Sequence, residues 1–577
     1  MKDLNLLNKA TATHLDQTFR AALAKASKGM SPLELGLSYL DWVSHLAISP
    51  GRSLLLAQSL LSKLRALGVY SFVSLLDKEA QGPASALERR VSGEAWKKWP
   101  FKVLAQAHQT GKDWWNEASI GVDGVRPEHE RLVQALAEQI LDMLSPANNP
   151  LTNPEVLKAT WEEKGKNLFR GLNLLRKDRR RDAANTGIEE NEGYQVGVNI
   201  GVTPGNVIFQ NELIELIQYT PSTPKVGAEP VLICPPWIMK YYILDLSPHN
   251  SMVKYLVDQG KTVFMISWKN PTQKDKYTSF DDYRTHGLMQ AIDVVNAVCP
   301  KRAINAVGYC IGGTLLTIGA ATMARDDDNR LGSISLFAAQ ADFSEAGEIM
   351  RFISPSQLSF LKKLMKKQGY LGMESMGGAF GALRAGDLIY TAAVDRYLLG
   401  KDAKPNDLMA WNADGTRMPY RMHHQYLQQL YLENQLALNK FTVDGRPISV
   451  ADIRAPLFVL GTETDHVAPW KSVFKLHDLT RQELTFLLTS GGHNAGVISG
   501  PEHPRRHYRA HTRNPGDKYM DPDTWLESRD AKAGSWWPYW NQWLEERMSK
   551  QTAPPSMGAA RKGYKILREA PGEYVMG

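Results

Sequence analysis

The segment Ala303-Ile304-Asn305-Ala306-Val307 leads directly into Gly308-Tyr309-Cys310-Ile311-Gly312, and this junction decides the fold of the chain. The first five residues are a short apolar run of strand type, and residues 313–321 are typical of a buried helix. A strand, a sharp turn and a helix form a nucleophile elbow, in which the turn presents its central side chain at the top of a parallel sheet. The pattern therefore predicts that Cys310 is a nucleophile, although most such elbows carry serine there. The alternative from the motif alone is a glycine-rich turn around a buried cysteine that packs as a small hydrophobe.

Two candidate partners follow Cys310, in the order acid and then histidine that elbow enzymes use. Residues 455–461 are predicted to form a strand that runs into Asp465, and residues 483–488 a strand that ends before Gly491-Gly492-His493. Both positions suit catalysis, because doubly wound sheets place their active sites at the carboxyl ends of strands. The sequence thus predicts a Cys310–His493–Asp465 triad, with His493 as the base and Asp465 as the acid that orients it.

Each partner also has an alternative interpretation. Asp465 lies in a turn of the kind where carboxylates cap helices, and His493 could be a structural histidine after a Gly-Gly turn. His466 is a rival base, but it directly follows Asp465 and is expected to point elsewhere. Of the 14 histidines, only His493 combines a strand end, a glycine turn and the expected chain order, which favours it as the base.

The chain divides into two regions of different pattern. Residues 1–190 show helical periodicity and are predicted to form a helical N-terminal domain. From residue 191 to 577, near-continuous apolar runs such as 230–233, 262–266 and 334–337 alternate with helical segments such as 282–298, a pattern typical of strands covered on both faces. We therefore predict an α/β-hydrolase fold there, with a doubly wound, mostly parallel sheet.

An insertion interrupts the strand pattern. From a strand ending near Phe343 to one starting at Pro456, the chain has no clear strand, and it is rich in Met and Gly at 373–378. The insertion falls where hydrolase-type enzymes carry a lid. We predict that residues 344–450 form a cap over Cys310, which would exclude water from an acyl-enzyme.

Composition and charge exclude several other classes. The net charge of +7 would suit an anionic ligand such as a CoA thioester, but no basic tract with interleaved aromatic residues predicts a nucleic-acid site. Three cysteines without a Cys/His cluster predict neither a disulfide framework nor zinc, and they indicate a reduced, cytoplasmic protein. The N-terminal residues lack an apolar signal core, and we expect no segment that spans a membrane.

Motifs along most of the chain resemble those of class I poly(3-hydroxyalkanoate) synthases, the bacterial polymerases that build polyester granules. Gly308-Tyr309-Cys310-Ile311-Gly312-Gly313 is similar to the family's lipase-like box with cysteine as nucleophile. The other similar segments are Pro235-Pro236-Trp237-Ile238-Met239-Lys240-Tyr241-Tyr242-Ile243-Leu244-Asp245-Leu246, Ser267-Trp268-Lys269-Asn270-Pro271, Asp465-His466-Val467-Ala468-Pro469-Trp470, Gly492-His493-Asn494-Ala495-Gly496 and Gly534-Ser535-Trp536-Trp537-Pro538. The resemblance extends from about residue 90 to the C-terminus.

The resemblance implies an acyltransferase that polymerises (R)-3-hydroxyacyl-CoA, with 3-hydroxybutyryl-CoA as the expected substrate, and releases CoA. CoA is part of the substrate, and no cofactor or metal is expected. His493 would deprotonate Cys310, and Asp465 would orient His493 and could also help to activate the 3-hydroxyl group. The oxyanion would be held by two backbone N–H groups, one from Ile311 and one from the loop at Trp237 and Ile238. Within that loop we choose Ile238 as the donor.

The same resemblance implies where and with what the protein acts. It implies a homodimer in the cytoplasm, at the surface of polyhydroxyalkanoate granules. The expected partners are the growing polyester chain, the granule surface and granule proteins of the phasin type, with no nucleic acid and no membrane span.

Two other functions stay open. A cysteine hydrolase on the same fold, either an intracellular polyester depolymerase or a thioesterase, would use the same triad with water as the acceptor. A non-enzymatic granule-surface protein with amphipathic helices would leave the elbow and both strand-end partners unexplained.

Overall fold

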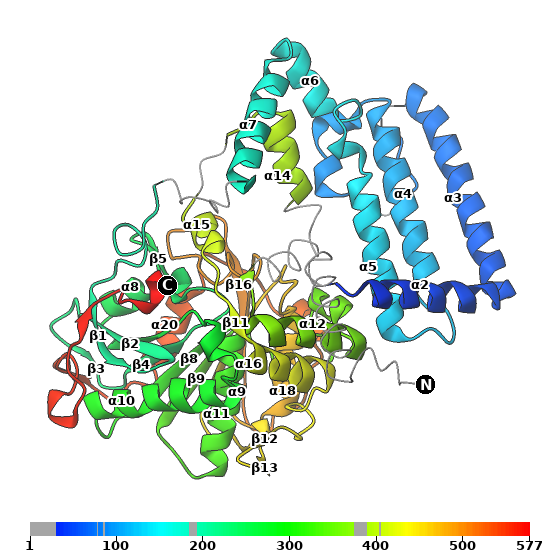
Figure 1. Cartoon of the computed structure of the whole chain (residues 1–577). Coiled ribbons are helices and arrows are strands. Elements are labelled where there is room, and N and C mark those ends of the chain that lie inside the picture. Colours follow the sequence, from blue (N-terminus) through cyan, green and yellow to red (C-terminus); the bar gives the residue numbers. More distant parts are fainter. Residues whose placement is uncertain (1–29, 78, 85–86, 184–192, 374–388, 403–405) are drawn as a thin grey trace, which may run out of the picture. The chain divides into compact units, whose positions relative to one another are not determined.

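The computed structural model describes residues 30–77, 79–84, 87–183, 193–373, 389–402 and 406–577 (Figure 1). Contacts within the chain divide it into two compact units. The first unit holds the described residues before 190 together with those of 351–360 and 374–404, and the second holds those of 190–350, 361–373 and 405–577. Parts of the predicted insertion therefore group with the helical first unit. The domain boundary at residue 190 and the role of 344–450 as a cap stay predictions.

Prolines start several helices of the first unit. Helices α2, α3, α5 and α6 each place a proline at their first position, where its missing N–H costs no hydrogen bond. The helices are α2 (Pro32–Ala47), α3 (Pro50–Leu76), α4 (Phe101–Ser119), α5 (Pro127–Met143), α6 (Pro154–Glu162), α7 (Lys166–Ala183) and α14 (Thr391–Ala393). Their buried residues form two small cores, one around Trp96 and Ala105 and one around Trp42 and Val133.

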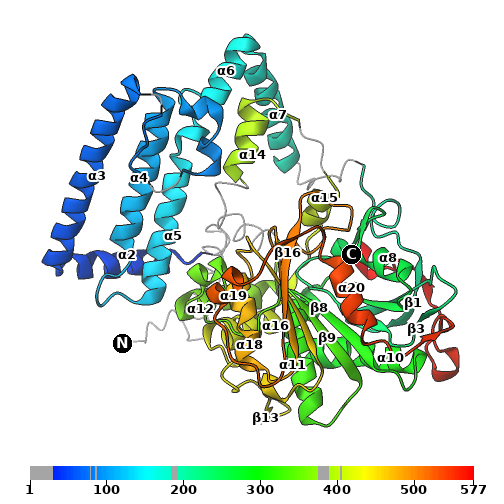
Figure 2. The same ribbon diagram turned by 180° about the vertical axis from the view of Figure 1, so that it is seen from behind.

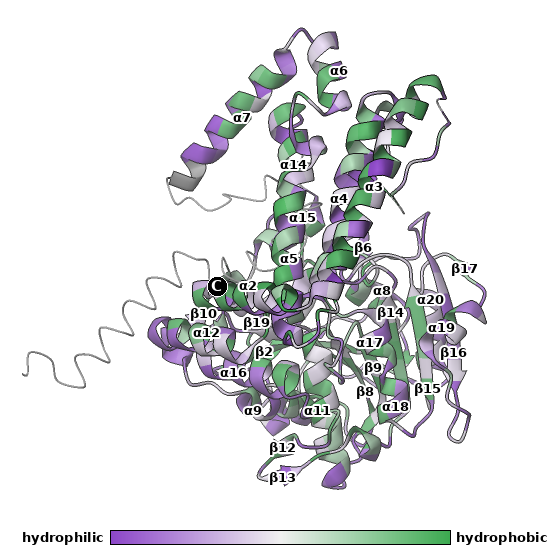
Figure 3. Cartoon of the chain, turned by 90° about the vertical axis from the view of Figure 1, so that its right-hand side faces the viewer, coloured by the Kyte–Doolittle hydropathy of each residue, from purple (hydrophilic) through white to green (hydrophobic). Residues whose placement is uncertain are grey.

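Helix α3 bears on the expectation that no segment spans a membrane. Among the described residues it is the one helix that is long and apolar enough to cross a membrane by length and composition. Scattered polar residues such as Lys63 and Arg65 concealed this property in the sequence. Only 11% of its most apolar window is buried, and apolar residues extend along the helix in Figure 3. Length and composition alone do not make it a span, because core helices of globular proteins meet the same criteria.

Eleven strands form one sheet in the second unit. Its central strands run parallel, in the order β7 (Val263–Trp268), β4 (Val231–Cys234), β8 (Ile304–Tyr309), β9 (Leu331–Phe337), β14 (Leu457–Thr462) and β15 (Leu484–Thr489). Antiparallel strands extend both edges, with β2 (Ile214–Tyr219), β1 (Gly205–Gln210) and β19 (Arg568–Glu569) beyond β7, and β16 (His507–Arg513) and β17 (Lys532–Ala533) beyond β15. The predicted α/β-hydrolase fold is confirmed.

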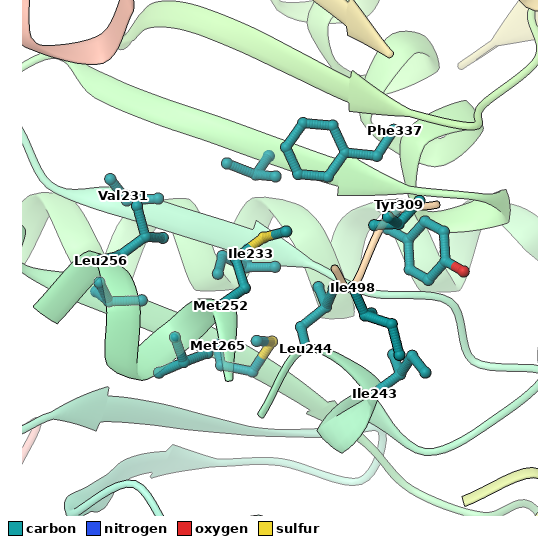
Figure 4. Packing of buried hydrophobic residues seen from close by; sticks show 14 of the residues in the cluster. Val231, Ile233, Ile243, Leu244, Met252, Leu256, Met265, Tyr309, Phe337 and Ile498 are labelled. Carbon is teal, nitrogen blue, oxygen red and sulfur yellow. The ribbon is translucent and has the colours of Figure 1, made fainter. Parts of the chain in front are cut away.

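Helices cover both faces of this sheet. Helices α8 (Met252–Asp258) and α20 (Trp537–Glu545) pack on one face, and α10 (Gln290–Val298) and α11 (Ile311–Arg325) pack on the other (Figure 1, Figure 2). Helix α17 (Trp470–Phe474) packs against β14. Because strand side chains alternate, Val231 and Ile233 of β4 point to the same face, where Figure 4 shows them close to Met252 and Leu256 of α8. All residues of β4, β7 and β8 are buried, as expected for strands covered on both sides. This packing holds the strand ends that carry the candidate site.

The insertion differs from the prediction in two details. Strand β9 ends at Phe337 rather than near Phe343, because the chain turns at Ala338, whose φ is 45°. Short strands occur within the insertion, namely β10 (Tyr370–Leu371) paired with β11 (Met418–Pro419), and β12 (Thr442–Val443) paired with β13 (Arg446–Pro447). Its helices include α12 (Pro355–Gln368), α15 (Asp407–Ala413), α16 (Tyr420–Gln425) and the π-helix η10 (Tyr426–Leu432). The part rich in Met and Gly lies, from residue 374, outside the described residues.

Candidate active site

Cys310 lies between β8 and α11 in the backbone conformation of a nucleophile elbow. Its φ is 53° and its ψ is −128°, and a positive φ is uncommon for a residue that carries a β-carbon. Hydrogen bonds hold this turn, since the Cys310 N–H donates to Phe337 O at 2.9 Å and the Cys310 carbonyl accepts from Gly313 N at 2.9 Å. The side chain is partly exposed, as a nucleophile requires.

Two glycines allow the elbow to close. A β-carbon at Gly308 would lie 2.9 Å from Gly313 N, and one at Gly312 would lie 2.6 Å from Pro235 O. Both distances are shorter than real Cβ contacts, so a side chain at either position would push the helix away from the strand. The close approach at Gly312 also brings the start of α11 against the loop that follows β4.

His493 and Asp465 lie at the same edge of the sheet as Cys310, after β15 and β14 respectively. His493 Nδ1 is 2.7 Å from Asp465 Oδ2, and the two side chains are 11% and 0% exposed. This bond leaves Nε2 as the ring nitrogen available to the Cys310 thiol, with which His493 interacts. The structure thus brings the three predicted residues together, whereas His466 uses its backbone carbonyl to accept a bond from Glu348 N at 3.1 Å.

The Asp465 carboxylate is fully engaged. Its Oδ1 accepts the backbone N–H groups of Val467 and Ala468 at 2.8 and 2.9 Å, and its Oδ2 accepts the Thr462 hydroxyl at 3.1 Å besides His493. Burial acts to raise the pKa of Asp465, but the charge and hydrogen bond of His493 and the two backbone donors outweigh it, so the pKa is lowered. The carboxylate therefore stays ionised, and no part of it is exposed to a substrate.

His493 is placed to hold a proton. Burial acts to lower its pKa, but the charge of Asp465 and then that of Cys310 raise it well above the ordinary value. Tyr309 supports the ring, because the two rings stack with centroids 5.5 Å apart. The Tyr309 hydroxyl donates to His493 O at 3.2 Å and to Asn494 Oδ1 at 2.5 Å. The sequence analysis did not single out Tyr309 for this role.

Arg506 holds the loop that carries His493, the candidate base. Its guanidinium donates to Ser490 O at 3.3 Å, to Ala495 O at 3.0 Å and to Ser499 Oγ at 2.8 Å. Burial lowers the pKa of Arg506, and no carboxylate of the described residues pairs with it. The charge of this side chain is thus directed at both ends of the loop. Its partners lie seven to sixteen residues away in the chain, and no sequence motif predicts these contacts.

The segment Gly534-Ser535-Trp536-Trp537-Pro538 also holds this loop. Trp536 Nε1 donates to Gly496 O at 3.0 Å, Trp537 Nε1 donates to Val497 O at 2.9 Å, and Ser535 Oγ donates to Ser499 O at 2.7 Å. The resemblance identified this segment but not its role. Its side chains satisfy the carbonyls of the histidine loop, which would otherwise be buried without partners.

The two candidate oxyanion donors come from neighbouring segments. Ile311 is the first residue of α11, and no acceptor among the described residues bonds to its N–H or to that of Ile238. The backbone around Ile238 is held by Thr416, whose N–H donates to Ile238 O at 3.2 Å and whose hydroxyl bonds to Trp237 O. An unoccupied N–H at a helix start is suited to bind a negative charge.

Aromatic residues from the π-helix η10 lie near the nucleophile. Burial, followed by Tyr431 and the charge of Cys310, raises the pKa of Tyr426 far above its ordinary value. Phe280 stacks on Tyr426 and Phe343 packs on Tyr431, with ring centroids 6.2 and 4.8 Å apart. π-helical turns often occur at functional sites. The rings give the nucleophile apolar surroundings that suit an acyl chain.

This arrangement can carry out nucleophilic acyl transfer. Cys310 would supply the nucleophile, His493 the proton acceptor and Asp465 the charge that fixes the imidazole ring. Among the residues that the structure describes, no group of three or more His, Cys, Asp and Glu side chains could hold a metal ion.

Family models match three parts of the chain. Residues 10–52 match "Poly-beta-hydroxybutyrate polymerase N terminal", and residues 87–256 match "Poly-beta-hydroxybutyrate polymerase (PhaC) N-terminus". Residues 229–497, which include the predicted triad, match "alpha/beta hydrolase fold".

Individual proteins are similar along most of the chain. The chain is 37% identical over 494 residues to the poly(3-hydroxyalkanoate) polymerase subunit PhaC of Rhizobium meliloti, which covers 85% of this chain and 79% of that relative. It is 32% identical over 553 residues to the corresponding subunit of Cupriavidus necator, and this match covers 94% of this chain and 91% of that relative. Among solved structures, a monoglyceride lipase variant from Saccharomyces cerevisiae is 12% identical with a TM-score of 0.35, and the match covers 62% of this chain and 99% of that one.

Proposed function

This chain belongs to the poly(3-hydroxyalkanoate) polymerase family, and on that premise we propose that it builds polyester from (R)-3-hydroxyacyl-CoA through an acyl-enzyme on Cys310. The recognition of a class I polymerase from the motifs is confirmed, so the protein is an acyltransferase that polymerises hydroxyacyl-CoA. One observation supports the proposed mechanism above the others, namely that an elbow cysteine interacts with a buried, hydrogen-bonded His493–Asp465 pair.

In the first half-reaction, His493 Nε2 takes the proton of the Cys310 thiol, and the thiolate attacks the thioester carbonyl of the substrate. The new bond joins Cys310 Sγ to the acyl carbon, and the bond from that carbon to the CoA sulfur breaks. His493 returns the proton to the departing CoA thiolate, which leaves as the free thiol. Because one thioester replaces another, this exchange is nearly isoenergetic.

In the second half-reaction, the hydroxyl group of another 3-hydroxyacyl unit attacks the acyl-enzyme. His493 accepts the hydroxyl proton, an ester bond forms, and the bond to Cys310 Sγ breaks, so that the thiol is restored with that proton. Thiolate is a better leaving group than alkoxide, which supports cysteine over serine as the nucleophile at this step.

We assign Asp465 the role of orienting His493 rather than of activating the substrate hydroxyl. Four hydrogen bonds engage its carboxylate, and its side chain has no exposed surface. A group in contact with substrate would need an exposed oxygen. The lowered pKa of Asp465 and the raised pKa of His493 both reflect the attraction between the carboxylate and the imidazolium that forms when His493 takes a proton.

The oxyanion of each tetrahedral intermediate would be held by the N–H groups of Ile311 and Ile238. Their unoccupied donors and the helix start at Ile311 support this choice. Losing one such donor costs on the order of 10²–10³ in rate.

For the protein in the cell, we propose action as a homodimer at the granule surface with phasin-type partners, on the strength of the family membership alone.

The direct test is incubation of the purified protein with (R)-3-hydroxybutyryl-CoA, with free CoA followed by a thiol reagent and polymer by turbidity. We expect CoA release together with growing insoluble polyester. Release of CoA with only free 3-hydroxybutyrate would identify a thioesterase and contradict polymerisation of this substrate. No CoA release would mean a different acyl chain or a different function.

A further inference from the structure

Three segments of the second unit carry more positive charge than the chain as a whole. Residues 269–278, 362–371 and 417–424 contain nine lysines and arginines and one aspartate, a net charge of +8, whereas the whole chain carries +7. These nine residues, called the basic surface below, are Lys269, Lys274, Lys276, Lys362, Lys363, Lys366, Lys367, Arg417 and Arg421. All of them belong to the second unit.

The three segments meet in space although they are far apart in sequence. Strands β10 and β11 pair at Tyr370 and Pro419, which joins the end of the second segment to the third. Arg421 N donates to Lys276 O at 3.1 Å, which joins the third segment to the first. The Arg417 guanidinium lies 5.1 Å from the centre of the Tyr370 ring. In Figure 3, α12 and α16 lie next to each other with hydrophilic residues along both.

Most of these charges have no counter-charge. Asp275 forms an ion pair with Lys269 at 3.2 Å and accepts hydrogen bonds from Thr272. No other carboxylate among the described residues pairs with the remaining eight. Tyr277 is 61% exposed, and the Lys276 ammonium lies 5.2 Å from the centre of its ring. An exposed aromatic ring amid unpaired cations suits a ligand that has both an aromatic base and phosphates.

The basic surface lies on the catalytic edge of the sheet. Its first segment continues directly from the carboxyl end of β7, and one strand, β4, separates β7 from β8 and Cys310. Two strand spacings amount to about 10 Å. Arg417 directly follows Thr416, which bonds to the backbone at Ile238. In doubly wound sheets, ligands bind outside the carboxyl ends of the strands, where this surface lies.

We propose that the basic surface binds the nucleotide part of the CoA thioester, an adenosine with a 5′-diphosphate and a 3′-phosphate. The proposal rests on the proposed function, which requires CoA to reach Cys310. The phosphates contact the lysines and arginines, and the adenine stacks on Tyr277. The pantetheine arm is about as long as four extended residues, roughly 13 Å, which is enough to carry the thioester from this surface to the nucleophile.

The test compares two variants that lose the same number of charges. In the first, the exposed residues Lys274, Lys362, Lys366 and Lys367 become glutamine. In the matched control, the exposed residues Lys225, Lys301, Lys440 and Lys565 become glutamine. Each variant is assayed with (R)-3-hydroxybutyryl-CoA and with (R)-3-hydroxybutyryl-N-acetylcysteamine, the same acyl thioester without the nucleotide.

The nucleotide contacts act equally in the ground state and the transition state, so their loss affects KM rather than kcat. We expect the first variant to raise KM for the CoA thioester about tenfold with kcat unchanged, since each exposed charge pair contributes little singly. Its kinetics with the truncated thioester stay those of the unmodified protein, and the control keeps both KM values within about twofold. Equal losses with both substrates, or the same loss in the control, would overturn the proposal.

Binding of CoA itself, measured by calorimetry, separates this proposal from the proposed function. If the unmodified protein releases no thiol from either thioester, yet the first variant binds CoA about tenfold more weakly than the control, the proposed function is wrong and the assignment of the basic surface is supported. Equal CoA affinity of the two variants overturns the basic surface. The proposal is also overturned if the first variant loses binding to phosphatidylglycerol vesicles while its CoA affinity is unchanged. That result would assign the positive charges to binding of an anionic lipid surface.

Discussion

The two units bury their apolar residues in different ways. In the second unit one core cluster joins the strands to α8 and α20, and Trp540 packs on Phe337 with ring centroids 5.0 Å apart. In the first unit the buried residues form two separate clusters of four and three members. Large apolar side chains stay on its surface, since Leu61 and Phe72 of α3 are each 68% exposed.

This difference follows from the needs of catalysis. Reacting groups must be held to within a fraction of an ångström, and only a continuous packed core with supporting hydrogen bonds does this. The predicted triad therefore lies at strand ends over the large core, and its histidine loop is held by Arg506 and two tryptophans. The first unit places no residue in the predicted triad and tolerates apolar surface. Substitutions in the two units should accordingly have very different effects.

The largest effect is expected at the nucleophile. Cys310→Ala should lower CoA release by on the order of 10⁶, because the covalent route disappears. Cys310→Ser should also lose most of the activity, because His493 is matched to a thiol. CoA release in steady state measures both variants, and circular dichroism verifies that they stay folded. Retained turnover in Cys310→Ala would move the nucleophile elsewhere.

A smaller loss is expected at the acid of the triad. Asp465→Asn should lower activity about 10⁴-fold, because the amide no longer stabilises the imidazolium or fixes its orientation. The loss should be equal for CoA release in a single turnover and for chain growth, since Asp465 acts on His493 in both. Normal acylation with stalled growth would instead indicate that Asp465 activates the substrate hydroxyl.

Arg506 should have an intermediate effect. Arg506→Ala should lower kcat about 10²-fold by misplacing the histidine loop, with little change in KM. Arg506→Lys should restore part of the loss, because lysine keeps the charge but not the three-way geometry. Steady-state kinetics across the pH range separates this role from a purely structural one, which would lower the amount of folded enzyme and leave the pH profile unchanged.

The raised pKa of His493 predicts how Cys310 reacts with pH. The ring loses its proton only as pH rises past its raised pKa. Only the neutral ring can accept the proton of the Cys310 thiol, so alkylation by iodoacetamide should increase as pH rises past the raised pKa of His493. In His493→Gln this step in the pH profile of alkylation should disappear. An unreactive Cys310 in the unmodified protein would favour a structural role for the cysteine.

The smallest effect is expected on the surface of the first unit. Leu61→Gln on α3 should change the free energy of unfolding by less than about 0.5 kcal/mol and leave CoA release unchanged. Trp540→Ala in the second unit should destabilise by about 3–5 kcal/mol, because it leaves a cavity in the core. Thermal and denaturant unfolding measure both. Comparable destabilisation by the two substitutions would break the contrast between the units.

Local patterns predicted the parts of the molecule that depend on neighbouring residues. The parallel strands appear as apolar runs because both of their faces are buried, and the elbow appears as G-x-C-x-G because Gly308 and Gly312 leave no room for a β-carbon. Cys310, Asp465 and His493 were predicted as a triad because each follows the end of a strand. Chain order and strand ends suffice for such predictions.

The residues that hold these groups in place could not be predicted this way. Tyr309 bonds to a loop 184 residues further on, and Trp536 bonds to a carbonyl 40 residues before it. The basic surface joins three segments that look unremarkable one at a time, and the apolar character of α3 is diluted by its polar residues.

The sequence alone was therefore enough to predict the fold, the family and a candidate triad, since periodicity and turn chemistry depend on adjacent residues. Tertiary structure decided three other features. These are the four hydrogen bonds to the Asp465 carboxylate, the hydrogen bonds by which Arg506 holds the loop of His493, and the assembly of the basic surface. They depend on which distant segments meet, and that is determined by the packing of the whole core.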